Sequence, residues 1–588
     1  MNLKKIMSLV LVSIMVLSVF STTAFAKNES AYVPSYDSET PIVILHGIGQ
    51  NETYILDEEG NRKLDSEGGY LTGWPLEIDL PAFLKRVIPA LLLSIVTQRD
   101  CGLTEAMSKG AYDLLYAVHK DNKGNYETDV EVPCYKCPMS EMPAEVRQKC
   151  YSMIPVERCG EIVGEDKLYY FGYDSLGDIE TTTKNLHKYI TEVVIPQTGA
   201  EQVNICPISL GGTLAVSYME MFKEDYPLIK KMVYVVPAVD GSDIVGDILI
   251  GRLSTENNEA LYYDLIKYLM GDTYTSYFIN MLLRIVPEKV MKSAVVGLSE
   301  GVVEAAVINC TQLWALCPSE YYEEARAKWI ADEAHSVIAK KVDAFMQARA
   351  NFAKNQAAFV NGGGKVYDIV CYGAEFFPIT RNYKNENTDG IIQSESTSMG
   401  ATFAPLGKTL GADYKAKGTY CSNPQHNHLS PEKDVDPTTG LFPCTTWYFK
   451  GQLHESLDGN DVCLGLATEL LTDDNMIDVY SNEAAYPQFN GARNVKNINR
   501  MINEYKAYDK SKLTSSEKEA IEKAIDEIDK EKSNTVINAE SWQKGEANLE
   551  NALVSAGIRE KEEVSLFESS LTTITRSMNR TLNTILDK

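Results

Sequence analysis

The interpretation of the whole chain begins with residues 203–214, which read Val203-Asn204-Ile205-Cys206-Pro207-Ile208-Ser209-Leu210-Gly211-Gly212-Thr213-Leu214. The mostly apolar residues 203–206 predict a short buried strand, and residues 211–222 predict a helix. Ser209 stands at the turn between them, followed by two glycines, which is the layout of a nucleophile elbow. In such a turn the serine hydroxyl stands clear of the backbone, and the helix N-terminus directs N–H groups toward a developing oxyanion. The alternative is a serine in a tight strand–helix turn without chemistry.

Pro207 departs from the usual G-x-S-x-G pattern, because it occupies the position of the first glycine. Proline fits an extended residue where its missing N–H is not needed by the sheet. The end of a strand is such a place, so the departure is compatible with the elbow but makes the motif less specific.

Further apolar segments outside this motif predict the other strands of a parallel sheet. They alternate with helical segments, as in βαβ units, so the sequence predicts an α/β fold. These segments are 40–45, which ends at His46-Gly47, and 167–174, 231–237, 365–373 and 445–450, the last expected strand.

The domain organisation follows from the spacing of these strands. A sheet domain is expected over 27–485, with insertions at about 51–165 and 242–364. The second insertion is helical and apolar, which fits either a lid with an acyl-chain pocket or a packed helical subdomain. Residues 80–96 predict an apolar helix in the first insertion. Residues 401–443 predict a loop rich in Pro, Asp and Gly, and 486–588 a C-terminal helical module.

Residues 1–26 have the pattern of a secretory signal peptide. Lys4 and Lys5 precede the apolar run 6–20, and the small-residue cleavage site 23–26 ends at Ala26. No other stretch is long and apolar enough to cross a membrane, so we expect a secreted, extracellular protein.

The net charge of −26 bears on the partners that the protein can have. Nucleic acids require a basic surface, so they are excluded as partners. The charge also argues against adsorption to anionic lipid by electrostatics alone.

Twelve cysteines occur, and an exported protein can form disulfides. Cys421 and Cys444 could close a loop, and Cys310 with Cys317 forms another local pair. A further local group has a C-x-x-C start but no histidine and no second C-x-x-C, so zinc is disfavoured there. This group is Cys134, Cys137, Cys150 and Cys159. No metal ligand or cofactor is predicted.

A nucleophilic serine needs a base and an orienting acid, which follow in the order serine, acid, histidine in this architecture. His454 comes directly after the last predicted strand, where the base belongs. His335 lies in a helix before the strand that should carry the acid, and His426 and His428 lie in the 401–443 loop. His46 stands at the wrong end of the sequence order and is interpreted as structural.

The acid is expected after the next-to-last strand. Asp389 occupies that position, directly before Gly390. Asp240 is an alternative, because it follows the preceding strand, and Glu395 is a third candidate.

Together these positions resemble the α/β-hydrolase lipases, in particular the bacterial secreted triacylglycerol lipases and related acyl hydrolases. The resemblance covers roughly 40–480 and implies Ser209 as nucleophile, Asp389 as acid and His454 as base. It further implies an oxyanion hole from the N–H groups of Ile48 and Leu210. The motifs that carry it are His46-Gly47, Ser209-Leu210-Gly211-Gly212, Asp389-Gly390-Ile391-Ile392 with Ser396 and Gly400, and His454.

Two features of those lipases fit this chain less well. The segment between Asp389 and His454 is longer than theirs. Some of them bind a structural calcium near the histidine loop, and Glu455, Asp458 and Asp461 could offer ligands, but with a different spacing. The acidic turns at 57–61 and 65–69 also lack the ladder of a calcium loop.

The function expected from the sequence is a secreted serine hydrolase, a lipase or carboxylesterase acting on lipid or small hydrophobic esters. Transient contact with a lipid interface would accompany such a substrate. An acyltransferase or amidase with the same triad is the enzyme alternative. A non-catalytic secreted binding protein on a hydrolase scaffold is the alternative from another class.

Overall fold

The computed structural model describes residues 32–588, apart from 66–67, 76–78, 155, 254–258, 424, 535–538, 560–565 and 587–588. The expected signal peptide at 1–26 lies outside the described residues, and export remains a prediction.

A seven-stranded sheet with every neighbouring pair parallel forms the centre of the molecule. Its strands, in spatial order, are β12 (Phe489–Gly491), β11 (Thr446–Lys450), β8 (Lys365–Tyr372), β7 (Ile229–Val235), β6 (Val203–Pro207), β1 (Ile42–Leu45) and β5 (Leu168–Phe171). Helices cover both faces, which explains why the central strands are apolar almost without interruption. The predicted α/β fold is confirmed.

One strand of the sheet was not expected from the sequence. β12 pairs in parallel with β11 at the edge, so the sheet extends beyond residue 485. The strand has only three residues and includes Asn490 and Gly491, so it carries no apolar pattern from which to predict it.

The two faces of the sheet form separate cores because side chains alternate along each strand. In β1, Val43 and Leu45 join the core under one set of helices, and Ile42 and Ile44 join the other. The first set comprises α6 (Ile179–Lys188), α8 (Gly211–Met221), α15 (Ser336–Ala350) and α16 (Phe352–Asn361). The second comprises α4 (Ala144–Met153), α5 (Glu157–Val163) and α18 (Asp461–Thr472).

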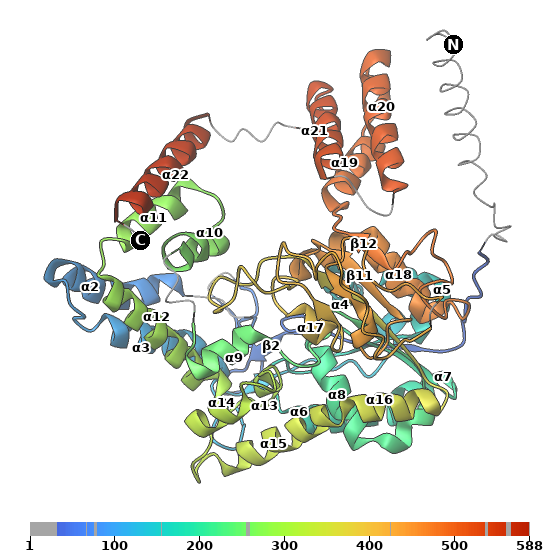
Figure 1. Cartoon of the computed structure of the whole chain (residues 1–588), viewed down its shortest axis with the longest axis horizontal. Coiled ribbons are helices and arrows are strands. Elements are labelled where there is room, and N and C mark those ends of the chain that lie inside the picture. The colour runs from blue at the N-terminus through green and yellow to red at the C-terminus, as the bar shows by residue number, and fades with distance from the viewer. Residues whose placement is uncertain are drawn as a thin grey trace, which may run out of the picture.

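The two insertions pack against each other (Figure 1). The first holds a small sheet of β3 (Thr72–Trp74), β2 (Thr53–Ile55) and β4 (Val130–Glu131), with α2 (Leu80–Thr97) and α3 (Leu103–Leu115). α2 matches the predicted helix at 80–96. The second holds α9 (Asp243–Ile250), α10 (Leu265–Met270), α11 (Tyr274–Leu283), α12 (Glu288–Val302) and α14 (Tyr322–Trp329). Val87 and Leu103 from the first insertion share a core with Val290 and Met291 from the second.

The C-terminal helices divide into two groups, unlike the single module that the sequence suggested. α19 (Lys496–Ala507), α20 (Ser515–Lys532) and α21 (Ala539–Ser555) share a small core of their own beside β12 (Figure 1). α22 (Leu566–Leu586) instead lies along α11, where the Arg576 guanidinium donates to Asp272 at 2.5 Å. α22 therefore packs against the second insertion.

Within the described ranges, no helix combines the length and apolar character required to cross a membrane.

Candidate active site

Three residues predicted to act together come from loops at one edge of the sheet. Ser209 follows β6, Asp389 follows β8 and His454 follows β11. Because all three strands are parallel, their carboxyl ends meet at the same edge, where ligands bind in open α/β sheets. The topology thus brings together residues that are far apart in the sequence.

Ser209 lies in the strained turn that the sequence predicted. Its φ of 52° is in the left-handed region, which a residue other than glycine rarely adopts. The backbone holds this conformation from two sides, since Ser209 N–H donates to Val235 O at 3.0 Å and Ala238 N–H donates to Ser209 O at 2.9 Å. Pro207 ends β6, and Ile208 N–H still bonds Leu45 O at 2.9 Å, so the proline leaves the strand intact.

The two glycines after Ser209 let α8 begin close to the neighbouring strands. A Cβ on Gly211 would lie 2.5 Å from the carbonyl oxygen of Leu45. A Cβ on Gly212 would lie 2.7 Å from Cβ of Pro237. Any larger residue at either position would displace the helix whose N-terminus faces the serine.

A continuous chain of hydrogen bonds links the three side chains. Nε2 of His454 lies 2.9 Å from Ser209 Oγ, and Nδ1 of His454 lies 2.7 Å from Asp389 Oδ2. The His454 backbone N–H also donates to the carbonyl oxygen of Asp389 at 2.9 Å. An ionised carboxylate only accepts, so Nδ1 carries the proton and Nε2 is left to accept from the serine hydroxyl.

Asp389 is fully buried, and its second oxygen is also satisfied. Oδ1 accepts from the N–H groups of Ile391 at 3.0 Å and Ile392 at 2.8 Å. These bonds fix the carboxylate for His454 and supply part of the solvation that burial removes.

The pKa of His454 reflects this pairing. Burial alone would lower it, but the Asp389 carboxylate favours the charged ring, and the pKa of His454 is raised above its ordinary value of 6.5. The arrangement therefore stabilises the imidazolium that forms when the ring takes a proton.

The rival acids are engaged elsewhere. Asp240 Oδ1 accepts from Ser319 Oγ at 2.5 Å and lies 3.5 Å from the Arg349 guanidinium. Glu395 lies in α17 (Ser394–Thr397), where burial raises the pKa of its carboxyl group. Asp389 is therefore the acid that is hydrogen-bonded to His454, and neither Asp240 nor Glu395 takes that position.

The other histidines that the sequence considered have partners other than Ser209. His335 pairs with Asp332 at 2.8 Å. His46 is fully buried and stacks on Tyr173 with ring centroids 3.9 Å apart, and burial lowers its pKa to about 4. That contact agrees with the structural role inferred for His46.

The expected oxyanion donors are available beside Ser209. Among the described residues, neither the Leu210 N–H nor the Ile48 N–H donates to a protein acceptor. Leu210 directly precedes α8, where backbone N–H groups lack helical partners. Ile48 lines the same cavity as Ser209 and His454.

Gln50, which the sequence did not single out, holds the Ile48 loop in shape. Its Oε1 accepts from Gly47 N–H at 2.6 Å, and its Nε2 donates to Met153 O at 3.0 Å. It ties the loop to α4 and thereby positions the Ile48 N–H. The one feature of the sequence that could have indicated this role of Gln50 is its place in the His46-Gly47-Ile48-Gly49-Gln50 run.

A cavity of about 370 Å³ opens beside Ser209 and His454. Its walls are mainly apolar and come from the 47–50 loop, the strand ends and α18, including Ile154, Val235, Leu464 and Leu471. None of its described lining residues belongs to 242–364, so the described wall of this pocket is not the one expected within the second insertion. α10 of that insertion nevertheless lies near the site: burial, then the charges of Glu455 and Asp389, raise the pKa of Tyr268.

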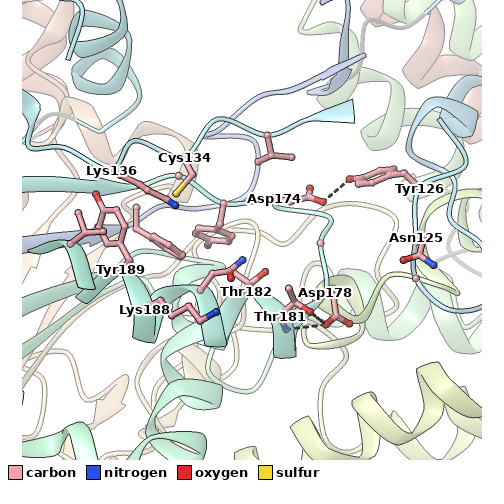
Figure 2. A pocket seen from close by; sticks show the side chains of 18 of the residues that line it. Asn125, Tyr126, Cys134, Lys136, Asp174, Asp178, Thr181, Thr182, Lys188 and Tyr189 are labelled. Atoms are coloured by element: carbon pink, nitrogen blue, oxygen red, sulfur yellow. Dashed lines mark hydrogen bonds between the residues drawn. The ribbon is translucent and has the colours of Figure 1, made fainter. Parts of the chain in front are cut away.

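A second cavity, of about 560 Å³, lies at the ends of β5 and α6 and is more polar (Figure 2). Tyr126 OH donates to Asp174 there at 2.8 Å, and Thr181 Oγ1 donates to Asp178 at 2.7 Å. Its described lining residues include neither serine nor histidine, so they offer no serine–histidine pair.

The acidic residues considered for calcium do not converge on one point. Asp458 pairs with Lys496, and Asp461 lies 3.1 Å from Nε of Arg493. Lysine and arginine thus occupy the positions that a cation would need. A different group of potential metal ligands lies in the 401–444 region and was missed from the sequence; it consists of Cys421, His426, His428 and Cys444.

Comparison with known proteins adds little to this geometry. No protein family and no curated protein matches the sequence. Among solved structures, a chain of the crystal structure of the Tle4-Tli4 complex is similar, with 13% identity and a TM-score of 0.32. The match covers 73% of this chain and 97% of the other. A similarity of this size assigns neither a family nor an activity.

Proposed function

We propose that the protein is an exported serine hydrolase that cleaves carboxylic esters with apolar acyl chains, in the manner of a lipase or carboxylesterase. The observation that carries the proposal is the Ser209–His454–Asp389 hydrogen-bond chain, with distances of 2.9 and 2.7 Å, at the mouth of an apolar cavity. Export rests on the pattern of residues 1–26 alone.

In the acylation step, Ser209 Oγ attacks the ester carbonyl while His454 Nε2 takes its proton. Asp389 stabilises the resulting imidazolium and keeps the ring in the correct tautomer. The N–H groups of Leu210 and Ile48 stabilise the oxyanion of the tetrahedral intermediate. His454 then protonates the leaving alcohol as the C–O bond breaks.

In the deacylation step, His454 takes a proton from water, which attacks the acyl-enzyme and releases the acid. The same residues repeat their roles, and the proton returns to Ser209 Oγ. An acceptor alcohol or amine in place of water would make the protein an acyltransferase, so water access decides between these activities.

Two features support an apolar substrate. The cavity wall is mainly apolar, with Ile, Leu, Val and Met side chains that would pack on an acyl chain. The neighbouring insertions also expose apolar residues to solvent, namely Leu92, Leu93 and Val96 on α2 and Phe278 on α11. Such exposed groups suit transient contact with a lipid interface despite the acidic net charge.

The test is hydrolysis of p-nitrophenyl esters from acetate to palmitate, combined with labelling by a fluorophosphonate. The mature chain should turn over at least one ester and carry the label on Ser209. Ser209→Ala should lose turnover by a factor on the order of 10⁶ and should not be labelled. The preferred chain length distinguishes a lipase from a short-chain esterase.

His335→Ala serves as the matched control, because it removes a partly exposed histidine that pairs with Asp332 and is not among the described residues lining the Ser209 cavity. It should keep full activity, whereas His454→Ala should not. Absence of both turnover and labelling in the folded protein would refute the proposal and favour a binding protein on a hydrolase scaffold. Acyl transfer to an added alcohol at the expense of hydrolysis would identify an acyltransferase.

A further inference from the structure

Four side chains from the 401–444 region converge on one point. Cys421, His426, His428 and Cys444 each direct one sulfur or nitrogen atom inward, and these atoms lie within 4.8 Å of one another. Apart from position 424, which the structure does not describe, the loop around them has almost no regular structure, with only β9 (Thr402–Phe403), β10 (Val435–Asp436) and a short turn of helix before β11. Convergence of this kind in an irregular loop requires an explanation.

Four of the six distances between these atoms are close to those of a tetrahedral metal site. The two sulfurs are 3.9 Å apart. Nδ1 of His426 lies 3.4 Å from Cys421 Sγ and 3.7 Å from Cys444 Sγ, and His428 Nε2 lies 3.5 Å from Cys444 Sγ. A tetrahedron with zinc bonds of about 2.3 Å to sulfur and about 2.0 Å to nitrogen separates two sulfurs by about 3.8 Å and sulfur from nitrogen by about 3.5 Å.

The spacing does not match the disulfide that the sequence suggested for Cys421 and Cys444. A disulfide joins its sulfurs at about 2.05 Å, far less than the 3.9 Å between these two, and both cysteines are free. Two histidine nitrogens beside the sulfurs would also have no role in a disulfide.

The hydrogen bonds around His428 prepare one of its nitrogens for a metal. Gln488 Nε2 donates to the carbonyl oxygens of Pro443 at 2.8 Å and Thr446 at 3.0 Å, which fixes the orientation of its amide. Gln488 Oε1 must then accept from His428 Nδ1–H, at 2.9 Å. The proton is held on Nδ1, so the lone pair of Nε2 faces the cluster, as in metal-bound histidines with an outer hydrogen-bond partner.

We propose that Cys421, His426, His428 and Cys444 form a structural Zn²⁺ site that fixes the 401–443 loop to the sheet. Two thiolates and two imidazoles in a tetrahedron are the ligand set that zinc prefers. Four protein ligands leave no position for water or substrate, which is typical of a structural site.

The position in the fold supports the structural role. Cys444 lies just before the amino end of β11, whereas His454 follows the carboxyl end of the same strand. Five residues of β11 separate the two ends by roughly 16 Å. The zinc would hold a 23-residue loop at the edge opposite to Ser209 and would take no part in ester cleavage.

The first test is the metal content of the mature protein, purified without chelator and measured by elemental mass spectrometry after gel filtration. We expect one zinc ion per chain. Replacement with Co²⁺ should give the thiolate charge-transfer and d–d absorption of a tetrahedral Cys₂His₂ site. These readouts are independent of enzymatic activity, so they hold or fail separately from the proposed function.

The variants identify the ligands. Cys444→Ser and His428→Ala should lose the zinc, whereas His426→Cys, which keeps four suitable ligands, should retain it. Gln488→Leu should bind zinc about 10–100-fold more weakly in competition with a chelator, because it removes the partner of His428. Cys137→Ser is the matched control, since Cys137 is also a partly exposed free cysteine, and it should keep its zinc.

Three results would overturn the proposal: wild-type protein without zinc, zinc retained in both Cys444→Ser and His428→Ala, or a Cys421–Cys444 disulfide found by non-reducing peptide mapping. If a variant fails to fold, the wild-type protein still decides. A mercurial reagent that modifies Cys421 and Cys444 should then release zinc in step with the modification, and release without it would also overturn the assignment.

Discussion

The two groups of converging side chains in this protein are assembled in opposite ways. Ser209 and His454 are 245 residues apart and meet because parallel strands end at one edge. Cys421 and Cys444 are 23 residues apart and meet within one irregular loop. The first group faces a cavity and leaves room for a substrate, whereas the second encloses its own centre.

This contrast shows that distance along the chain is a poor guide to whether a site can be foreseen. The long-range group follows a topological rule that holds for every parallel sheet. The short-range group depends on the path of a loop without periodicity, and on Gln488 and Tyr480 from a later segment, which pack on its histidines. The following predictions test whether the two groups are as separate as their construction implies.

The largest effect should come from the acid of the triad. Asp389→Asn should lower kcat by about 10⁴-fold, because the amide favours the wrong tautomer of His454 and cannot stabilise the imidazolium. Asp240→Asn should change kcat little, since Asp240 contacts Ser319 and Arg349 instead. Steady-state ester hydrolysis measures both, and the reverse ranking would contradict the assignment of Asp389.

A smaller loss should follow from loosening the oxyanion loop. Gln50→Ala removes the acceptor of the Gly47 N–H and the tie to Met153, so the Ile48 N–H loses its position. We expect kcat to fall by about 100-fold, with little change in KM, because the loop acts on the transition state. Gln50→Glu keeps the acceptor but not the donor and should recover part of the rate. An equal loss in both variants, or an effect confined to KM, would argue against this positioning role.

The pH profile should show the pairing of His454 with Asp389. The base must be neutral, so kcat/KM should fall as the pH drops through the pKa of His454, which is raised above 6.5. In Asp389→Asn the attraction is lost and burial alone remains, so the acid limb of the residual activity should move to lower pH. A pH-stat assay avoids the titration of p-nitrophenol, and an unshifted limb would contradict the electrostatic coupling.

The smallest catalytic effect should come from the Cys/His group. Cys444→Ser should lower Tm and hasten proteolysis of the 401–443 loop, because the loop loses its attachment to β11. The kcat/KM of the variant that remains folded should match the wild type, since the triad lies at the opposite edge. Thermal unfolding and ester hydrolysis on the same preparation measure the two effects. A large loss of kcat at unchanged Tm would show that the two groups are coupled.

The sequence by itself determined the α/β class, six of the seven central strands and the three residues that the hydrogen-bond chain joins. These follow from apolar runs, from the Ser209 turn with its glycines, and from the rule that parallel strands end at one edge. Ser209, Asp389 and His454 could be named because each directly follows a strand that is readable from its composition.

Only the tertiary structure decided the remaining features. β12 has three residues and is a strand because β11 offers it an edge. α22 leaves the other C-terminal helices for α11, because residues such as Arg576 find partners there. The cavity wall comes from α18 and the 47–50 loop instead of the second insertion. Likewise, two cysteines that could have formed a disulfide instead share a centre with His426 and His428. Each outcome depends on packing between distant segments, and that packing cannot be predicted from local sequence patterns.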